Sequence, residues 1–392
     1  MPSAVRPHTW WPLPFRTEAP LAGCRFLLVA IALVAGPALD AQEVNQEWIT
    51  PRGVVMDPDR ARMLYVSNNP EDMFLGRDLE ADIQRRLEIQ RRYEDVTARV
   101  VDFRMVQYRS SADDLDIPAY LYQPLEPRGE GGHPALIWVH GGVRGQWTAN
   151  YWPFVKEAVE RGYVVIAPDY RGSIGWGEEL HAKFDYGGYE VDDNVSAYHW
   201  MVENLPHVDP GRVAMIGWSH GGYNALLAVS RPPHPLAAAV AIVPVSNLIF
   251  RLSYKGPSYQ HHFSTGYRLE GLPFERREEY VYRSPVYQVD HIHVPVLVHL
   301  ADNDQDVNFE EAEMLVHALK VKKPNLAETK IYNDPRGGHS FDRQVDMETL
   351  TPRWTPHMRD SWNRIWAFLE WNLRPYEDGQ GNVVGEYRGL GR

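Results

Sequence analysis

The sequence predicts an α/β fold in which a mostly parallel central sheet is flanked by helices on both faces. Three observations predict it. Apolar strand-like runs alternate with helix-like segments from residue 135 to residue 373, as in a parallel sheet with crossover helices. The sequence GWSHGG at residues 217–222 stands between an apolar run and a helix-like segment, as in a tight strand-to-helix turn. Polar or glycine-rich segments follow several predicted strands, at the sheet edge where ligands bind in such folds.

The N-terminal residues 1–41 have the form of a secretory signal. An apolar run at 26–35 follows Arg16 and Arg25 and precedes small residues through Ala41, and it is too short to span a membrane. We therefore expect export, periplasmic or secreted, with no stable membrane insertion after cleavage; the alternative is a buried N-terminal helix. Cys24, the only cysteine, precedes the apolar run, so a lipid anchor is not expected.

Residues 42–99 are predicted to form an N-terminal extension that is partly helical. The spacing of Leu79, Ile83 and Leu87 among arginines predicts an amphipathic helix over 78–93. This helix is expected to lie on the main domain in a structural role, with substrate binding or dimerisation as the alternatives.

Residues 100–375 form the predicted main domain, and residues 376–392 a polar, glycine-rich tail. The first two strands, which suggest an edge hairpin, are expected at 100–109 and 117–123. Further strands are expected at 135–139, 164–167, 213–216, 238–243, 296–300 and 329–332. Helices are expected at 152–161, 191–203, 220–230, 309–319 and 358–373. Asn308 is a candidate cap for the fourth of these helices, with Glu310 and Glu311 in its first turn.

Ser219, inside the GWSHGG sequence, is the candidate nucleophile. The flanking glycines let the backbone bend sharply, so that the hydroxyl points out above the sheet. A serine hydroxyl is a poor nucleophile, and it needs a base and a third group that orients this base. His339, on the loop after the strand at 329–332, is the expected base.

Three aspartates after the strand at 296–300 compete for the role of the orienting acid. Asp304 is favoured because it begins a D-x-x-V sequence that ends at Val307, a usual acid turn. Asp302 is the second candidate, and Asp306 is expected to be a solvated or capping carboxylate. Their spacing also imitates a calcium loop, but Val307 occupies the position that needs glycine.

The sequence HGG at 140–142, directly after the strand at 135–139, offers backbone donors for an oxyanion. The expected donors are the N–H groups of Gly142 and of His220, the residue after the nucleophile. The side chain of His140 is expected to shape this loop and the substrate pocket, and the ring of His220 to line the pocket. Four separated segments thus supply one expected part each, which argues against an accidental glycine-rich turn at Ser219.

The segment 247–290 lacks a clean period and is rich in tyrosine, phenylalanine and histidine. We hypothesise that this segment covers the site and that Tyr254, Tyr259 and Phe263 help to form the pocket. The alternative is that these three residues only pack within a surface segment. The histidine pairs at 261–262 and 291–293 are too few ligands for a metal, and no metal or cofactor is expected.

Together these residues resemble the catalytic domain of the prolyl oligopeptidase family of serine hydrolases, over residues 100–373. The shared motifs are IPAYLYQP at 117–124, HGG at 140–142, PDYRGS at 168–173 with the following GWG, the serine turn with its extra Gly222, D-x-x-V, and GH at 338–339. The resemblance implies an α/β-hydrolase fold and acyl transfer by Ser219, His339 and Asp304.

The sequence departs from the family's pattern in three places. Val143 follows HGG where many members have proline, and His220 stands where tyrosine is common, but neither change removes a backbone N–H group. Full-length peptidases of the family usually carry an N-terminal β-propeller, for which residues 42–99 are too few. We expect an exported serine hydrolase, a peptidase by resemblance. The alternatives are a carboxylesterase acting on small or carbohydrate-linked esters and, more remotely, a non-catalytic binding protein.

The expected partner is a small-molecule or short-peptide substrate. A formal net charge of −12 argues against nucleic acid, because phosphate binding needs a cationic face. The sequence predicts no oligomeric state.

Overall fold

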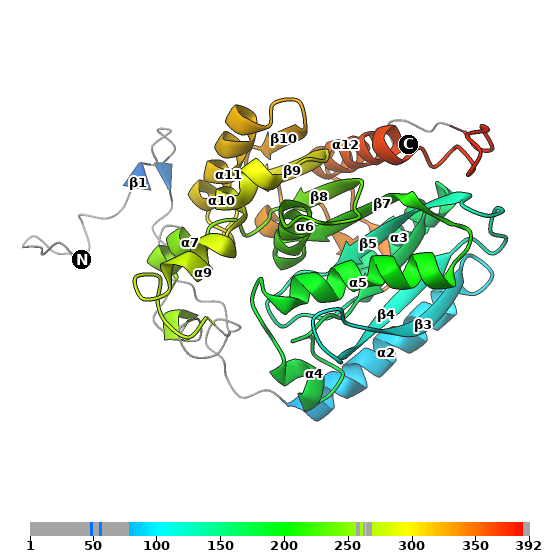
Figure 1. The fold of residues 1–392 in the computed structure, drawn as a ribbon, viewed down its shortest axis with the longest axis horizontal. Coiled ribbons are helices and arrows are strands. Elements are labelled where there is room, and N and C mark those ends of the chain that lie inside the picture. The colour runs from blue at the N-terminus through cyan, green and yellow to red at the C-terminus, as the bar shows by residue number, and fades with distance from the viewer. Residues whose placement is uncertain are drawn as a thin grey trace, which may run out of the picture. The chain divides into compact units, whose positions relative to one another are not determined.

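The computed structural model describes residues 78–255, 259–261, 263 and 269–386, together with the paired strands β1 (Trp48–Ile49) and β2 (Val55–Met56) (Figure 1). The predicted signal segment, residues 1–41, lies outside the described residues. Within the described ranges, no helix combines the length and the apolar character needed to cross a membrane.

Eight strands form the central sheet, in the order β10-β9-β8-β7-β5-β6-β4-β3. They are β3 (Asp102–Arg109), β4 (Asp116–Gln123), β5 (His133–Val139), β6 (Val164–Pro168), β7 (Val208–Trp218), β8 (Ala238–Ile242), β9 (Val296–Ala301) and β10 (Ala327–Tyr332). The strands from β5 to β10 pair in parallel, whereas β3 and β4 form an antiparallel hairpin at one edge. The mostly parallel sheet and its edge hairpin are therefore confirmed.

Helices cover both faces of this sheet (Figure 1). The longer ones are α2 (Leu79–Thr97), α3 (Trp152–Glu160), α5 (Tyr189–Asn204), α6 (His220–Ser230), α11 (Phe309–Lys322) and α12 (Pro356–Leu373). Residues of α5, α6 and α11 share one apolar core, and residues of α2, α3 and α12 share the other. Alternate residues of β5 enter the two cores, with Ile137 in the first and Trp138 in the second. A strand buried on both faces reads as a continuous apolar run, which is why β5 was recognisable in the sequence.

Helix α11 begins where the sequence predicts. The Asn308 side chain accepts a hydrogen bond from the Glu310 N–H at 2.9 Å, and Glu310 and Glu311 occupy the first turn. Acidic residues at this end are stabilised by the unpaired N–H groups of the first turn. The predicted cap is confirmed.

Short elements escaped the sequence-based prediction. They are the helices α4 (Glu178–Ala182), α7 (Leu248–Tyr254), α9 (Arg277–Tyr282) and α10 (Pro285–Gln288), and the hairpin of β11 (Val345–Asp346) with β12 (Thr351–Pro352). Each is too short to show a hydrophobic period. Three of them, α7, α9 and α10, lie in the segment 247–290, which the sequence left without assigned elements.

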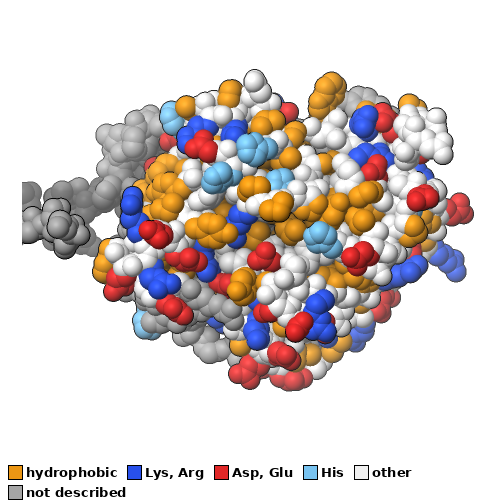
Figure 2. Space-filling model, in the orientation of Figure 1, with side chains coloured by type: hydrophobic (Ala, Val, Ile, Leu, Met, Phe, Trp, Pro, Cys, Tyr) orange, Lys and Arg blue, Asp and Glu red, His pale blue; other side chains and the backbone are white. Residues whose placement is uncertain are grey.

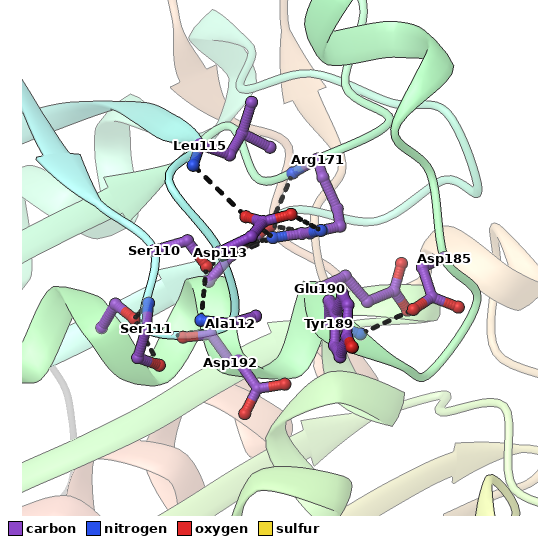
Figure 3. A network of polar contacts seen from close by, with 12 residues as sticks. Ser110, Ser111, Ala112, Asp113, Leu115, Arg171, Asp185, Tyr189, Glu190 and Asp192 are labelled. Carbon is purple, nitrogen blue, oxygen red and sulfur yellow. Dashed lines mark hydrogen bonds and ion pairs between the residues drawn. The ribbon is translucent and has the colours of Figure 1, made fainter.

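A buried polar network fastens the loop after β6 to helix α5 and to the turn between β3 and β4 (Figure 3). Arg171 is fully buried; its guanidinium lies 2.7 Å from Asp193 Oδ1 and 3.0 Å from Asp113 Oδ1. Asp169, in the same loop, accepts hydrogen bonds from the Trp147 N–H at 2.6 Å and from Trp176 Nε1 at 2.7 Å. Burying a charged group without partners is costly, so these contacts hold the loop in one position beside the HGG segment.

Candidate active site

Ser219 lies at the turn between β7 and α6 with a positive φ, at φ 54° and ψ −116°. Such angles are strained for a residue with a side chain and need support from the surrounding structure. The Ser219 N–H donates to Ile242 O on β8 at 2.8 Å, which anchors the turn to the neighbouring strand. The predicted strand–turn–helix context of this serine is present.

Two glycines let helix α6 approach the sheet at this turn. A Cβ atom on Gly221 would lie 2.1 Å from Val139 O of β5, and one on Gly217 would lie 2.3 Å from the carbonyl carbon of Gly221. No real Cβ atom tolerates such distances to backbone atoms. The glycines of the motif are therefore required for close packing, which places the first turn of α6 directly behind Ser219.

His339 meets one of the three candidate aspartates. Its Nδ1 lies 2.7 Å from Asp304 Oδ2, and His339 itself sits in the 3-10 turn η4 (Gly338–Ser340) after β10. The other oxygen, Asp304 Oδ1, accepts hydrogen bonds from the N–H groups of Asp306 and Val307, both at 2.9 Å. Asp302 bonds elsewhere, because its Oδ1 accepts from the Asp334 N–H at 2.6 Å. Asp304 is thus the carboxylate positioned to orient His339.

Ser219 and His339 line one cavity of about 590 Å³ at the carboxyl ends of the parallel strands. The loop after β5 contributes Gly142 and Tyr151 to its lining, and the loop after β9 contributes Asp306. The carboxyl ends of parallel strands meet at one edge of the sheet, which brings together loops that lie far apart in the sequence.

Both expected oxyanion donors border this cavity. Gly142 has φ +88°, a conformation that favours glycine, and it lines the cavity beside Ser219. His220 is the first residue of α6, where backbone N–H groups have no acceptor within the helix. Their role as donors to an oxyanion stays a prediction.

The side chains of His140 and His220 are buried. The His140 ring stacks on Tyr170 with centroids 4.4 Å apart, its Nε2 lies 3.0 Å from Ser173 Oγ, and burial lowers its pKa to about 4. His140 is not among the described residues that line the cavity, which fits a role in shaping the loop. The His220 side chain is 1% exposed and its Nε2 lies 2.7 Å from Glu190 Oε1, so little of the ring is open to the cavity.

The three aromatic residues proposed for the pocket lie beneath its surface. Tyr254, Tyr259 and Phe263 are buried, and none of them belongs to the described lining of the cavity. Arg251 and Lys255 from the same segment line it instead. The hydroxyl groups of both tyrosines accept hydrogen bonds from the Arg251 guanidinium, at 2.9 Å and 2.8 Å. The aromatic residues therefore support the pocket through Arg251, and a direct contact with substrate stays a prediction.

The sequence-based search also missed the other cationic residues of the cavity, Arg144 and Arg343. Isolated arginines carry no motif, so no sequence signal could have found them. In the described ranges, no group of three or more His, Cys, Asp or Glu side chains is arranged to hold a metal ion, and His262 lies outside those ranges.

Comparisons with known proteins give consistent results. The model of the prolyl oligopeptidase family matches residues 149–358. The uncharacterized peptidase YuxL of Bacillus subtilis (strain 168) is 30% identical over 240 residues, which cover 61% of this chain and 35% of that protein. The acylamino-acid-releasing enzyme of Mus musculus is 27% identical over 241 residues, covering 60% of this chain and 32% of that enzyme. The chain thus spans about a third of the length of these relatives.

A solved structure gives the same result for the fold. The structure of an acylaminoacyl peptidase in complex with Z-Gly-Gly-Phe-chloromethyl ketone superimposes with a TM-score of 0.58. It is 20% identical in sequence, and the match covers 71% of this chain and 43% of that one. At this level of identity the likeness concerns the fold, which is the α/β-hydrolase fold expected from the sequence.

Proposed function

Because the chain belongs to the prolyl oligopeptidase family, we propose that it is a serine peptidase that hydrolyses short peptides through an acyl-enzyme intermediate. The observation that carries the proposal is the contact of His339 Nδ1 with Asp304 Oδ2 at 2.7 Å, in a cavity that Ser219 also lines. The names of the relatives, a peptidase and an acylamino-acid-releasing enzyme, support a peptide-like substrate.

In this proposal Ser219 Oγ attacks the carbonyl carbon of the scissile peptide bond while His339 Nε2 accepts the hydroxyl proton. Asp304 accepts the Nδ1–H of His339, which leaves Nε2 as the basic nitrogen and stabilises the imidazolium that forms. His339 then donates the proton to the leaving amine as the carbon–nitrogen bond breaks. Water repeats the sequence on the acyl-enzyme, and the carboxylic acid product leaves Ser219 free.

The oxyanion that forms at each step needs donors that are already in place. We assign them to the N–H groups of Gly142 and His220, which come from the loop after β5 and from the first turn of α6. The strained backbone of Ser219 and the close approach of Gly221 to β5 support this assignment, because they bring the two segments to the same side of the cavity.

The test combines an activity-based probe with two substrate panels. A fluorophosphonate is expected to label the wild-type protein and the exposed-serine control Ser253→Ala, but not Ser219→Ala. Fluorogenic peptides are then compared with p-nitrophenyl esters of graded chain length. Brisk ester turnover without peptide turnover would replace the peptidase proposal by a carboxylesterase. A folded wild-type protein that resists labelling would favour a non-catalytic binding protein.

We also propose that the protein is exported. The proposal rests on the apolar run at 26–35 with arginines before it and small residues after it. Intact-mass measurement of protein from the periplasmic or culture fraction is expected to show a chain that begins near Ala41. Full-length chain confined to the cytoplasmic fraction would refute export, and it would leave the catalytic proposal untouched.

A further inference from the structure

The cavity around Ser219 is unusually cationic for this protein. The whole chain carries a formal net charge of −12, and on the face shown in Figure 2 basic and acidic side chains are interspersed. Against this background, the described lining of the cavity contains one carboxylate, Asp306, and four cationic side chains, Arg144, Arg251, Lys255 and Arg343. A local excess of positive charge at a binding site favours ligands with a negative charge.

Two of these cations are engaged within the protein. The Arg251 guanidinium lies 3.3 Å from Glu311 Oε2 and is almost fully buried, so its charge is already compensated. Arg144 Nη1 lies 2.7 Å from His181 Nε2. Lys255 is likewise buried, and only 4% of its surface is exposed. Arg251 and Lys255 are therefore too deeply buried to be the main direct contacts of a ligand.

Arg343 differs from Arg251 and Lys255 because it is partly exposed, and among the described residues no carboxylate lies within ion-pair distance of it. Its Nη1 donates a hydrogen bond to the Tyr151 hydroxyl at 3.4 Å, and its guanidinium carbon lies 5.9 Å from the centre of the Trp218 ring. The carboxyl group of its chain neighbour Asp342 is buried and accepts a hydrogen bond from Trp218 Nε1. The guanidinium of Arg343 thus has donors left for a ligand.

Arg343 also lies next to the nucleophile. A Cβ atom built on Gly141 would be 3.4 Å from Ser219 Cβ and 3.5 Å from Arg343 Nη1, so both side chains flank the same point. Tyr151 links Arg343 to the HGG segment at 140–142, because its hydroxyl oxygen also accepts a hydrogen bond from the Gly141 N–H at 3.4 Å. A substrate bound at Ser219 therefore passes within reach of the guanidinium.

The position of Arg343 in the chain indicates which part of the substrate it contacts. It follows His339 by one short turn, and its N–H donates to Ser340 O at 3.2 Å. In the proposed mechanism His339 delivers a proton to the leaving amine, so the leaving group lies on the His339 side of Ser219. Arg251 and Lys255 enter the cavity from the segment after β8 instead. Arg343 also lines a second cavity together with His339 and Ser340, and this shared position argues that it serves the leaving-group side.

We propose that Arg343 binds the free α-carboxylate of a short leaving fragment, an amino acid or a dipeptide, so that the enzyme favours cleavage next to the carboxyl terminus of its substrate. This inference rests on the proposed peptidase function. A guanidinium fits a carboxylate with two parallel hydrogen bonds, and such charged pairs are stronger than neutral ones. The carboxylate is unchanged by the reaction, in which the peptide carbon–nitrogen bond breaks and the leaving amine takes its proton from His339.

The experiment compares two fluorogenic peptides that differ only in a C-terminal carboxylate or a C-terminal amide. The wild-type enzyme is expected to prefer the acid by about tenfold or more in kcat/KM. Arg343→Gln is expected to lose this preference, because kcat/KM for the acid falls, mainly through a higher KM, by a larger factor than kcat/KM for the amide. Arg343→Lys is expected to retain part of the preference. Arg364→Gln removes an exposed guanidinium from helix α12 and serves as the matched control for charge.

The outcomes separate this inference from the proposed function. Equal turnover of acid and amide by the wild-type enzyme would overturn the inference alone, and so would an unchanged preference in Arg343→Gln. An equal loss on both peptides in Arg343→Gln and Arg343→Lys would assign Arg343 a structural role and would also overturn it. Failure of the wild-type enzyme to cleave either peptide, while it is labelled by fluorophosphonate, would overturn the peptidase proposal as well. Thermal unfolding of each variant shows whether it is folded.

Discussion

Asp304 occupies its position because a short turn uses both oxygens of its carboxylate. Oδ1 accepts two backbone N–H groups from the residues that follow, and Oδ2 is left for His339. A carboxylate held in this way cannot rotate away from the imidazole. Asp302 and Asp306 have the same chemistry and similar places in the sequence, but the turn points neither of them at His339.

Replacing the two neighbouring aspartates separately tests this assignment. Asp304→Asn is expected to lower kcat by about 10⁴-fold, because an amide does not hold the tautomer that leaves Nε2 basic. Asp302→Asn is expected to change kcat by no more than about threefold, since its side chain only caps the loop at Asp334. Steady-state kinetics on one ester substrate and the rate of fluorophosphonate labelling measure both. Equal losses in the two variants would contradict the assignment.

The sequence alone could predict the site residues that belong to a motif. It could not predict the site residues whose role depends on a contact with a distant part of the chain. Ser219 and His339 could be predicted because each stands at a fixed place relative to a strand. Asp304 was favoured by its D-x-x-V turn, but Asp302 stayed a second candidate until the structure showed the contact with His339. The rings of Tyr254, Tyr259 and Phe263 were hypothesised to help form the pocket, with packing of a surface segment as the alternative. The residues of that segment that line the cavity are Arg251 and Lys255. Which side of a short helix faces a cavity depends on neighbours far away in the chain.

At the scale of elements, the junction of β5, β7 and α6 positions the nucleophile. The N-terminus of α6 can lie directly against β5 only because Gly221 has no side chain. The same glycine belongs to the G-x-S-x-G motif. The motif is therefore needed for the close packing of α6 against β5 as well as for the turn at Ser219.

Gly221→Ala is expected to destabilise the protein by at least about 2 kcal/mol, because the new methyl group would displace backbone atoms of β5. It is also expected to slow fluorophosphonate labelling, since α6 carries the His220 N–H. Gly129→Ala is the control, because a Cβ atom there has no neighbour within 4 Å. Urea unfolding and labelling rates measure the two effects. Unchanged stability and labelling in Gly221→Ala would show that α6 can shift without consequence.

The long helices and strands could be predicted from the sequence, whereas the short helices could not. Most of the buried strands and of the helices with a full hydrophobic period appear within a few residues of their expected bounds. Strand β7 is the exception, because it begins at Val208 rather than at the expected residue 213. Helices α7, α9 and α10 did not show in the sequence, because a helix of one or two turns is set by tertiary packing rather than by its own pattern.

At the scale of the whole molecule, buried ionisable groups between the sheet and helix α12 make stability depend on pH. Burial lowers the pKa of His299 from 6.5 to about 3 and raises the pKa of Asp342 from 3.8 to about 6. Between pH 6.5 and 3, the unfolded state binds a proton at His299 that the folded state does not, so stability falls as the pH falls. Asp342 acts in the opposite direction, because its folded carboxyl keeps a proton that the unfolded chain releases between pH 3.8 and 6.

His299→Gln is therefore expected to make the free energy of unfolding less sensitive to acid. Relative to the wild type, the variant should lose up to about 2 kcal/mol less between pH 7 and pH 5. Asp342→Asn should have the opposite effect and make the free energy of unfolding fall more steeply as the pH is lowered. Urea unfolding at several pH values gives both slopes, and the comparison with wild type removes the contribution of the other buried groups. Parallel pH profiles for wild type and His299→Gln would show that folding does not lower the pKa of this histidine.

By itself, the sequence determined the α/β class, the order of the long elements, and the serine and histidine that the motifs mark. These follow from local periodicity and from turns that particular residues require. Only the tertiary structure decided that Asp304 meets His339, that the rings of His140 and His220 are buried, and that Arg343 stands beside Ser219. Such contacts join segments far apart in the chain, and their geometry exists only once the sheet and the helices on both of its faces have packed.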